Sequence, residues 1–169
     1  MNSKDLGTIR SHDKIYLNEN RKINTKESFK FLVKKSSEFI NSTENPDILD
    51  IGCATGDFVY YLSKTFPQAK CVGMDVIDDL LDRAKKEVPN VKFILSDISN
   101  KNSLPSEKFD VVFCSDVIMH LTDPIKALQN IHKISKKYLI LGNPINHMPI
   151  RGQGKKKGIK NIFKNILLK

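Results

Sequence analysis

Short apolar runs alternate with amphipathic segments through the middle of the chain. The runs DILDI (47–51), KCVGM (70–74) and VKFIL (91–95) are dominated by apolar residues with no regular polar alternation. FDVVFC (109–114) and KYLIL (137–141) have the same character. Runs rich in Val, Ile and Leu are typical of parallel strands that are covered on both faces. Five such strands are therefore predicted.

Helices are predicted before and between these strands. A segment that starts with Thr25 as its N-cap has apolar residues at helical spacing and ends at the turn-forming cluster NSTENP. Two further helices are predicted at about 57–64 and 78–86. Another begins at Asp123 and Pro124, because an N-cap acid followed by proline in the first turn favours a helix start.

The repeated order of strand and helix predicts a Rossmann-like, doubly wound α/β fold. The sheet should be mainly parallel, with about five strands and with helices on both faces. In such sheets the ligand binds at the carboxyl ends of the strands, near the point where the strand order reverses.

The two ends of the chain differ from this middle part. Residues 1–24 are polar and have no clear period, which indicates an arm or loop. After Asn143 the chain becomes rich in Pro and Gly and then basic. A short basic amphipathic helix is predicted near the end, with its apolar face formed by Ile159, Ile162, Phe163, Ile166 and Leu167.

These patterns divide the chain into three parts. Residues 1–45 form an N-terminal arm and helix, residues 46–145 form the predicted Rossmann-like domain, and residues 146–169 form a basic amphipathic tail. At 169 residues the chain is long enough to bury a sizeable core.

The positive charge is concentrated in the tail. The net charge is +9, yet residues 124–169 contain eleven of the 28 Lys and Arg and no acid, whereas the first 123 residues hold 17 basic and 19 acidic groups. The body of the protein is therefore not predicted to bind nucleic acid. No apolar run approaches the ~20 residues of a spanning helix, and the first residues lack the apolar core of a signal peptide.

The cysteines indicate a reducing compartment. Cys53, Cys71 and Cys114 form no CxxC pair and no Cys/His ligand spacing. An odd number of cysteines inside predicted strands fits reduced, buried thiols of a cytoplasmic protein. No metal site is predicted.

The stretch ILDIGCATGDF, which begins at residue 48, carries the candidate chemistry. Asp50 is followed by small residues at alternate positions, and these allow the backbone to approach a ligand closely. A dinucleotide fingerprint would have glycine at position 57, where Asp57 stands, and no G-K-[ST] sequence follows. The turn is therefore expected to accept a nucleoside but not a pyrophosphate. The small residues are Gly52, Ala54 and Gly56.

Two more acids follow the next two predicted strands. Asp75 ends the second strand, where a carboxylate can accept hydrogen bonds from both hydroxyls of a ribose. Asp97 follows the third strand, where it can accept a hydrogen bond from the exocyclic amine of a base while Ile98 packs on the ring. Three carboxylates at successive strand ends favour a ligand with a ribose, an amine and a positive charge.

Together these segments resemble class I methyltransferases that use S-adenosylmethionine. The resemblance rests on ILDIGCATGDF, VGMDV, ILSDIS and FDVVFCSDVIMHLTDP, which occur in the order and spacing of that family. It implies a methyltransferase that binds S-adenosylmethionine and acts on a small-molecule, lipid-linked or saccharide-like acceptor. The sulfonium methyl group is already activated, so alignment of the acceptor supplies most of the rate.

The resemblance also implies roles for single residues. Asp75 would hold the ribose, with Val76 beside it. Asp97 and Ile98 would hold the adenine, and Ser115, after the fourth strand, would close the cofactor pocket. The remaining cofactor-binding residues, around the methionine end, would be Asp50, Gly52, Cys53, Ala54 and Gly56.

Other residues near the expected site have two interpretations each. His120 in DVIMHL is the candidate catalytic base, and the alternative is a hydrogen-bonded or pocket-lining histidine. Tyr16 either folds over the cofactor or is a surface tyrosine. Asp116 is interpreted most simply as a turn or helix-start residue.

The end of the chain departs from the family pattern. Family members continue with an antiparallel hairpin after the fifth strand, whereas the residues after Asn143 indicate a loop and a helix. The sheet is therefore predicted to lack this C-terminal hairpin. A second hypothesis follows, a catalytically degenerate methyltransferase-fold module that docks to a membrane or a partner through its basic tail.

The tail itself has three interpretations. Its apolar face docks on the sheet edge, or its basic and apolar faces lie on the anionic inner membrane surface, making the protein peripheral to that surface. The third interpretation, contact with nucleic acid, is disfavoured because no aromatic platform or binding motif accompanies the lysines.

Overall fold

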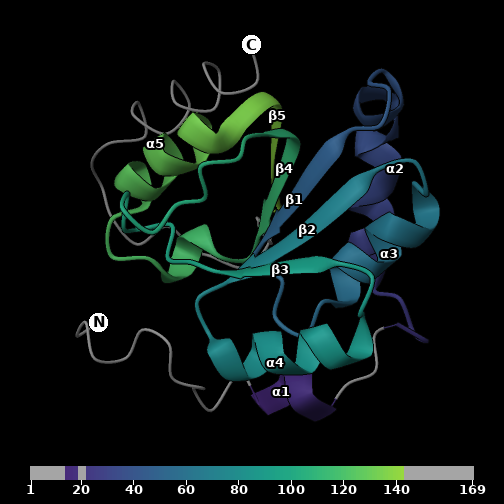
Figure 1. Ribbon diagram of the computed structural model, residues 1–169, viewed down its shortest axis with the longest axis horizontal. Helices are drawn as coiled ribbons and strands as arrows, with labels where there is room; N and C mark the ends of the chain where they lie inside the picture. Colours follow the sequence, from purple (N-terminus) through teal and green to yellow (C-terminus); the bar gives the residue numbers. More distant parts are fainter. Residues whose placement is uncertain (1–13, 19–21, 143–169) are drawn as a thin grey trace, which may run out of the picture.

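Five strands form one fully parallel sheet in the computed structural model, which describes residues 14–18 and 22–142 (Figure 1). The spatial order is β3-β2-β1-β4-β5. The chain therefore builds outward from β1 to β3 and then returns to place β4 on the other side of β1. The strands are β1 Asp47–Ile51, β2 Lys70–Asp75, β3 Lys92–Leu95, β4 Phe109–Ser115 and β5 Ser135–Gly142. The predicted Rossmann-like, doubly wound sheet is confirmed.

The helices lie close to the positions that the apolar periodicity predicts. In the described residues they are α1 Lys14–Asn18, α2 Glu27–Asn41, α3 Asp57–Thr65, α4 Asp78–Glu87, the short 3-10 helix η1 Ile118–His120 and α5 Pro124–Ile134. Asp123 is the N-cap of α5, and its carboxylate accepts a hydrogen bond of 2.9 Å from the backbone N–H of Lys126.

Two details at the N-terminal side differ from the predictions. The arm predicted as irregular contains the short helix α1, which lies beside α4 (Figure 1). Arg83 on α4 donates a hydrogen bond to the carbonyl of Leu17. The predicted N-cap Thr25 is wrong by one residue: the carbonyl of Lys26 accepts the first bond of α2, from Phe29, and no side chain caps this end.

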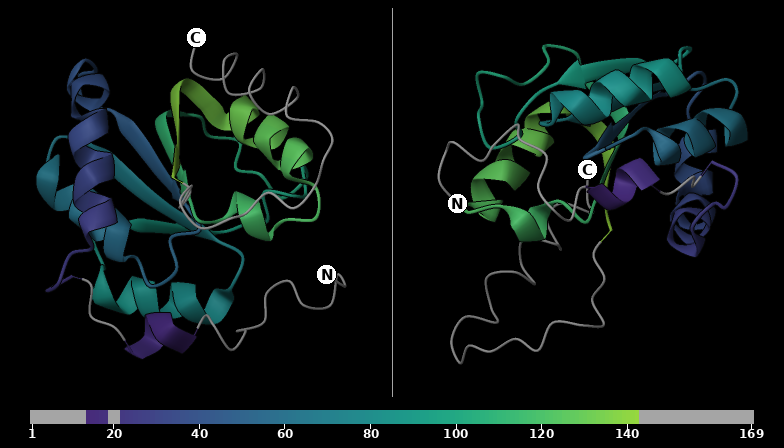
Figure 2. Two further views of the ribbon diagram at one scale, coloured as in Figure 1. Left: turned by 180° about the vertical axis from the view of Figure 1, so that it is seen from behind. Right: turned by 90° about the horizontal axis from the view of Figure 1, so that it is seen from below.

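Apolar residues are buried on both faces of the sheet. On one face, α2 and α3 contribute residues such as Val33 and Leu62, which pack with Ile48. On the other face, α5 contributes residues such as Ile131, which packs with Leu49. Neighbouring residues of β1 thus point to opposite covered faces, and this explains why the strands are apolar without alternation. The two views of Figure 2 and the view of Figure 1 agree on this layering.

The predictions for the C-terminal segment concern residues outside the described part of the chain. The basic tail at 146–169 and the predicted lack of a C-terminal hairpin both fall there, so they stay predictions, as does the division into 1–45, 46–145 and 146–169. Within residues 14–18 and 22–142, no helix is long and apolar enough to cross a membrane.

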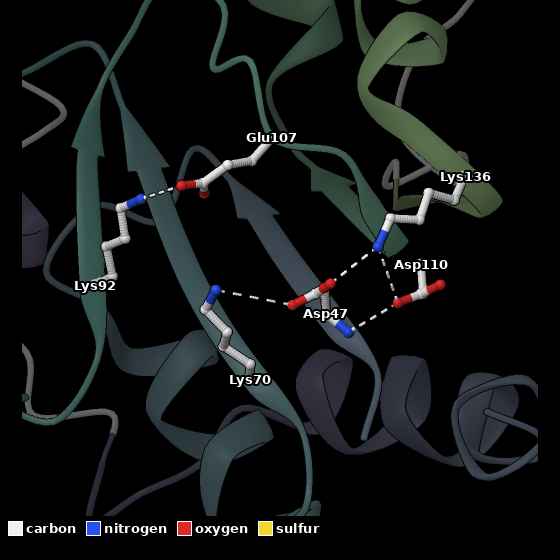
Figure 3. A network of polar contacts seen from close by, with 6 residues as sticks. All are labelled: Asp47, Lys70, Lys92, Glu107, Asp110 and Lys136. Atoms are coloured by element: carbon white, nitrogen blue, oxygen red, sulfur yellow. Dashed lines mark hydrogen bonds and ion pairs between the residues drawn. The ribbon is translucent and has the colours of Figure 1, made fainter. Parts of the chain in front are cut away.

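A network of charged side chains lies at the amino ends of the strands (Figure 3). Lys136 of β5 donates to Asp47 of β1 at 2.9 Å, and it also contacts Asp110 of β4 at 3.5 Å. Asp110 accepts a further hydrogen bond of 3.0 Å from the backbone N–H of Asp47. Because Asp110 is only 8% exposed, this backbone bond satisfies a carboxylate that water hardly reaches. The edge opposite the predicted site is thus held by paired charges.

Replacement of Asp110 by alanine should destabilise the protein. The change leaves the N–H of Asp47 and the ammonium of Lys136 without this acceptor, which should lower the free energy of unfolding by about 1–3 kcal/mol. Urea unfolding measures the difference. Glu107→Gln is the matched control, because its 2.6 Å pair with Lys92 is exposed and should contribute almost nothing. Equal losses in the two variants would contradict the assignment.

Candidate functional site

The turn between β1 and α3 has a backbone conformation that a ligand could approach closely, because three of its residues have a positive φ. Gly52 and Gly56 have φ values of +77° and +82°, and Ala54 has +47°. The N–H groups of Gly52 and Cys53 both donate to the carbonyl of Met74 in β2, at 2.7 and 3.1 Å. Gly56 is the N-cap of α3, so the turn passes directly into a helix N-terminus.

Close packing fixes the glycines of this region. A Cβ atom on Gly52 would lie 2.3 Å from Cγ2 of Val117, in the loop that follows β4. A Cβ on Gly73, inside β2, would lie 2.7 Å from the ring of Phe93 and 2.8 Å from Sγ of Cys53. Gly73, Phe93 and Val117 are not among the site residues predicted from the sequence. An isolated glycine inside a strand was the available signal, because it indicates close approach of a neighbouring group.

Asp75 joins the glycine turn to the end of β2. One carboxylate oxygen accepts a hydrogen bond of 2.8 Å from the backbone N–H of Ala54. The other accepts bonds of 2.7 and 3.0 Å from the N–H groups of Val76 and Ile77. This carboxylate is therefore fixed in position at the strand end, where the sequence predicts the ribose site. Val76 follows it directly and is half-buried.

Asp50 is a buried carboxylate next to this turn. It is 3% exposed, and among the described residues its Oδ2 atom has no hydrogen-bond partner. Burial, and then the charge of Asp75, raise the pKa of Asp50 well above its ordinary value. A buried carboxylate without a donor is costly, so a donor or cation bound here would stabilise the ionised form.

Cys53 lies inside the turn as a neutral thiol. It is 5% exposed, and burial followed by the charges of Asp50 and Asp75 raises its pKa well above the ordinary value. A thiol in such surroundings packs as a small apolar group and is a poor nucleophile.

The segment after β3 is held by local hydrogen bonds. Oδ1 of Asp97 accepts a bond of 2.7 Å from the N–H of Ser99, and Ser103 bonds to both the N–H and the carbonyl of Asp97. Ile98 is 5% exposed and packs in the core, while its carbonyl accepts a bond of 2.8 Å from the side chain of Asn130 on α5. The predicted contacts of Asp97 and Ile98 with adenine stay predictions.

The ends of β4 and β5 meet beside the turn. Ser115, the last residue of β4, is half-buried and pairs in register with Gly142 of β5. A Cβ atom on Gly142 would lie 2.4 Å from Oγ of Ser115. His120 lies on η1 and is exposed. The hydrogen bond from Ala54 to Asp75 connects the Gly52–Gly56 turn to the end of β2. Val117, in the segment after Ser115, packs against Gly52 of the same turn. The roles predicted for Ser115 and His120 stay predictions.

A parallel sheet in the order β3-β2-β1-β4-β5, with a glycine turn after β1 and an acid at the end of β2, is a Rossmann-like nucleotide-binding arrangement. The chain belongs to the methyltransferase domain family, whose model matches residues 42–153. The resemblance found in the sequence is therefore confirmed.

Curated relatives match the same part of the chain. The malonyl-[acyl-carrier protein] O-methyltransferase 1 of Ilyobacter polytropus is 27% identical over 109 residues, which are 62% of this chain and 40% of that protein. The demethylmenaquinone methyltransferase of Chlorobaculum tepidum is 29% identical over 103 residues, 61% of this chain and 42% of that protein. The chain thus spans about two fifths of the length of these relatives.

Solved structures show the same fold. The plantazolicin methyltransferase BpumL, in complex with a substrate analogue and SAH, superposes with a TM-score of 0.62 at 24% identity, covering 77% of this chain and 51% of that one. A SAM-dependent methyltransferase from Aquifex aeolicus gives a TM-score of 0.61 at 25% identity, covering 79% of this chain and 72% of that one.

Replacement of Asp50 by asparagine should stabilise the protein in a pH-dependent way. Because the pKa of Asp50 is raised in the folded state, its contribution to stability is greatest below the ordinary carboxyl pKa of about 4. That contribution is lost as the pH rises toward the folded pKa. The gain in unfolding free energy from Asp50→Asn should therefore grow above about pH 4, to about 1–3 kcal/mol.

Urea unfolding from acidic to neutral pH tests this expectation. Ile48→Val, in the same strand, is the control, because it changes the free energy of unfolding without removing a titrating group. A gain from Asp50→Asn that does not vary with pH would contradict the assignment.

Replacement of Gly52 by alanine should destabilise the turn. A left-handed backbone costs an L-residue about 1–2 kcal/mol, and the added Cβ would also overlap Val117. Combining Gly52→Ala with Val117→Ala removes the overlapping methyl groups of Val117 but leaves the backbone strain at residue 52. The double variant should therefore recover part of the loss in a double-mutant cycle of unfolding free energies. Additive losses would show that the two residues do not meet.

Proposed function

We propose that the chain is an S-adenosylmethionine-dependent methyltransferase that acts on a small-molecule, lipid-linked or saccharide-like acceptor. Its membership of the methyltransferase domain family supports the class of enzyme. The observation that carries the cofactor assignment is the buried Oδ2 of Asp50 beside the glycine turn, which has no hydrogen-bond partner in the part of the chain that the structure describes. A ligand with an ammonium group, such as the methionine part of S-adenosylmethionine, suits this carboxylate.

The other predicted cofactor residues are distributed along the same edge. The fixed carboxylate of Asp75 would receive the ribose hydroxyls, with Val76 next to it, and Asp97 and Ile98 would receive the adenine. The backbone of the turn would approach the methionine part closely, because Gly52 and Gly56 carry no side chain and Ala54 a small one. Cys53 would contribute packing, and Ser115 would border the pocket.

The chemistry requires alignment more than covalent machinery. S-adenosylmethionine supplies an activated methyl group, so the residues of this chain need to hold the acceptor atom in line with it and exclude water. A base is needed only for an acceptor that loses a proton, and His120, exposed on η1, is the candidate for that role.

The names of similar proteins support a small or carrier-linked acceptor. They include a malonyl-[acyl-carrier protein] O-methyltransferase, a demethylmenaquinone methyltransferase and an amino pentose methyltransferase. These acceptors differ from one another, so the acceptor of this chain is to be identified from its own labelled product.

Calorimetry with S-adenosylhomocysteine tests the cofactor site. The purified chain should bind it, and Asp75→Ala should weaken binding by about 1–3 kcal/mol because both ribose hydroxyls lose an ionised acceptor. Asp110→Ala is the matched control: it loses hydrogen bonds at the opposite edge of the sheet and should leave binding unchanged. No binding to the wild-type chain at millimolar ligand would reject the function.

Methyl transfer is tested separately. Incubation with S-adenosylmethionine labelled in its methyl group and a fractionated cell extract should yield a labelled small molecule. Binding of the cofactor without any transfer would instead support the degenerate methyltransferase-fold module.

A further inference from the structure

Asp116 has a backbone conformation that L-residues rarely adopt. It follows β4 directly and has a φ of +59°. In the described residues only Asn45 and Ala54 share a positive φ without being glycine. Glycine would adopt this conformation without strain, whereas aspartate is only moderately tolerant of it. Strained residues of this kind are concentrated at functional sites.

The position of Asp116 is next to the proposed cofactor site. Its N–H donates a hydrogen bond of 2.8 Å to the carbonyl of Gly142, at the end of β5. The next residue, Val117, reaches the glycine turn, where its Cγ2 is 2.3 Å from the position of a Cβ on Gly52. Asp116 therefore stands where the ends of β4 and β5 meet the turn after β1.

The carboxylate of Asp116 differs from the neighbouring acids. Asp75, Asp97 and Asp123 each accept backbone N–H bonds. Asp116 is exposed, and its carboxylate makes no hydrogen bond or ion pair within the part of the chain that the structure describes. It does not cap η1 either, since the N-cap there is Val117 and has no side-chain bond. The interpretation of Asp116 as a turn residue concerns its backbone and stays a prediction, whereas no capping bond among the described residues involves its carboxylate.

We propose that Asp116 binds the methyl acceptor, accepting a hydrogen bond from the O–H or N–H of the group that becomes methylated. This inference rests on the proposed methyltransferase function. In the reaction, the bond between the acceptor oxygen or nitrogen and the methyl carbon forms as the carbon–sulfur bond breaks. The electron pair of the broken bond stays on sulfur, and the acceptor proton passes to a base, for which His120 is the candidate, or to water. Asp116 orients the acceptor lone pair through that proton until it leaves.

The proposal also restricts the class of acceptor. An ionised carboxylate as acceptor would be repelled by Asp116, because two like charges in contact disfavour each other. The acceptor should therefore be an alcohol, phenol or amine. Its labelled product should be stable in mild base, whereas a methyl ester would release methanol.

Two variants separate the carboxylate from the backbone. Asp116→Gly removes the carboxylate and relieves the positive φ, so the fold should be at least as stable. Asp116→Asn keeps a side chain that tolerates this φ but removes the charge. Asn45→Gly is the matched control, because it relieves the same kind of strain, at φ +46°, in the turn before β1.

The experiment measures cofactor binding and methyl transfer for each variant. Calorimetry with S-adenosylhomocysteine comes first. The initial rate of methyl transfer from labelled S-adenosylmethionine is measured next. The acceptor is supplied by the small-molecule fraction of a cell extract that the wild type labels, added at a concentration that limits the rate. Both Asp116 variants should bind S-adenosylhomocysteine as the wild type does. Transfer should fall roughly 10-fold in Asp116→Asn and roughly 100-fold in Asp116→Gly, but not in Asn45→Gly.

Three results would overturn the proposal while leaving the cofactor site in place. They are transfer at the wild-type rate in both Asp116 variants, a parallel loss of cofactor binding, and a labelled product that mild base cleaves as a methyl ester. A wild-type chain that binds the cofactor but labels nothing would overturn both the transferase activity and this role of Asp116. Failure of the wild type to bind S-adenosylhomocysteine would reject the proposed function itself.

Discussion

The carboxylate of Asp75 holds the site together. One of its oxygens bonds to the N–H of Ala54, in the turn after β1, while the other bonds to the backbone just beyond β2. The turn needs this acceptor because its left-handed residues direct N–H groups away from regular strand or helix partners. The ribose role predicted for this carboxylate stays a prediction, whereas its part in shaping the turn is set by these backbone bonds.

The two edges of the sheet use charge in opposite ways. At the amino ends, Asp110 is satisfied by the backbone N–H of Asp47 and by Lys136 (Figure 3). At the carboxyl ends, Asp50 is buried with an unsatisfied oxygen, and Asp116 is exposed without a partner among the described residues. Paired charges satisfy the first edge, whereas at the second the buried carboxylate of Asp50 is costly when ionised and that of Asp116 is solvated. The contrast is consistent with the ligand site predicted at the carboxyl ends of the strands.

Most of the fold could be predicted because its signals are local. Runs such as DILDI at 47–51 match β1 to the residue, and Asp123 with Pro124 gave the start of α5. The site could be predicted less completely from the sequence. Asp75 could be placed at a strand end, but its three backbone bonds depend on how β1 and β2 align. Gly73 and Phe93 were missed because their contact joins two strands that only the sheet brings together.

The amino-acid sequence by itself determined the order of strands and helices, the glycine turn and the acids that follow the strands. Apolar periodicity and turn chemistry act over a few residues, so they can be read along the chain. Only the tertiary structure decided which acids are satisfied. Asp75 accepts a bond from the turn after β1, Asp50 is buried with an oxygen that no described residue satisfies, and Asp116 is strained and exposed. Hydrogen-bond partners and burial are set by segments that are distant in sequence, and folding alone brings those segments into contact.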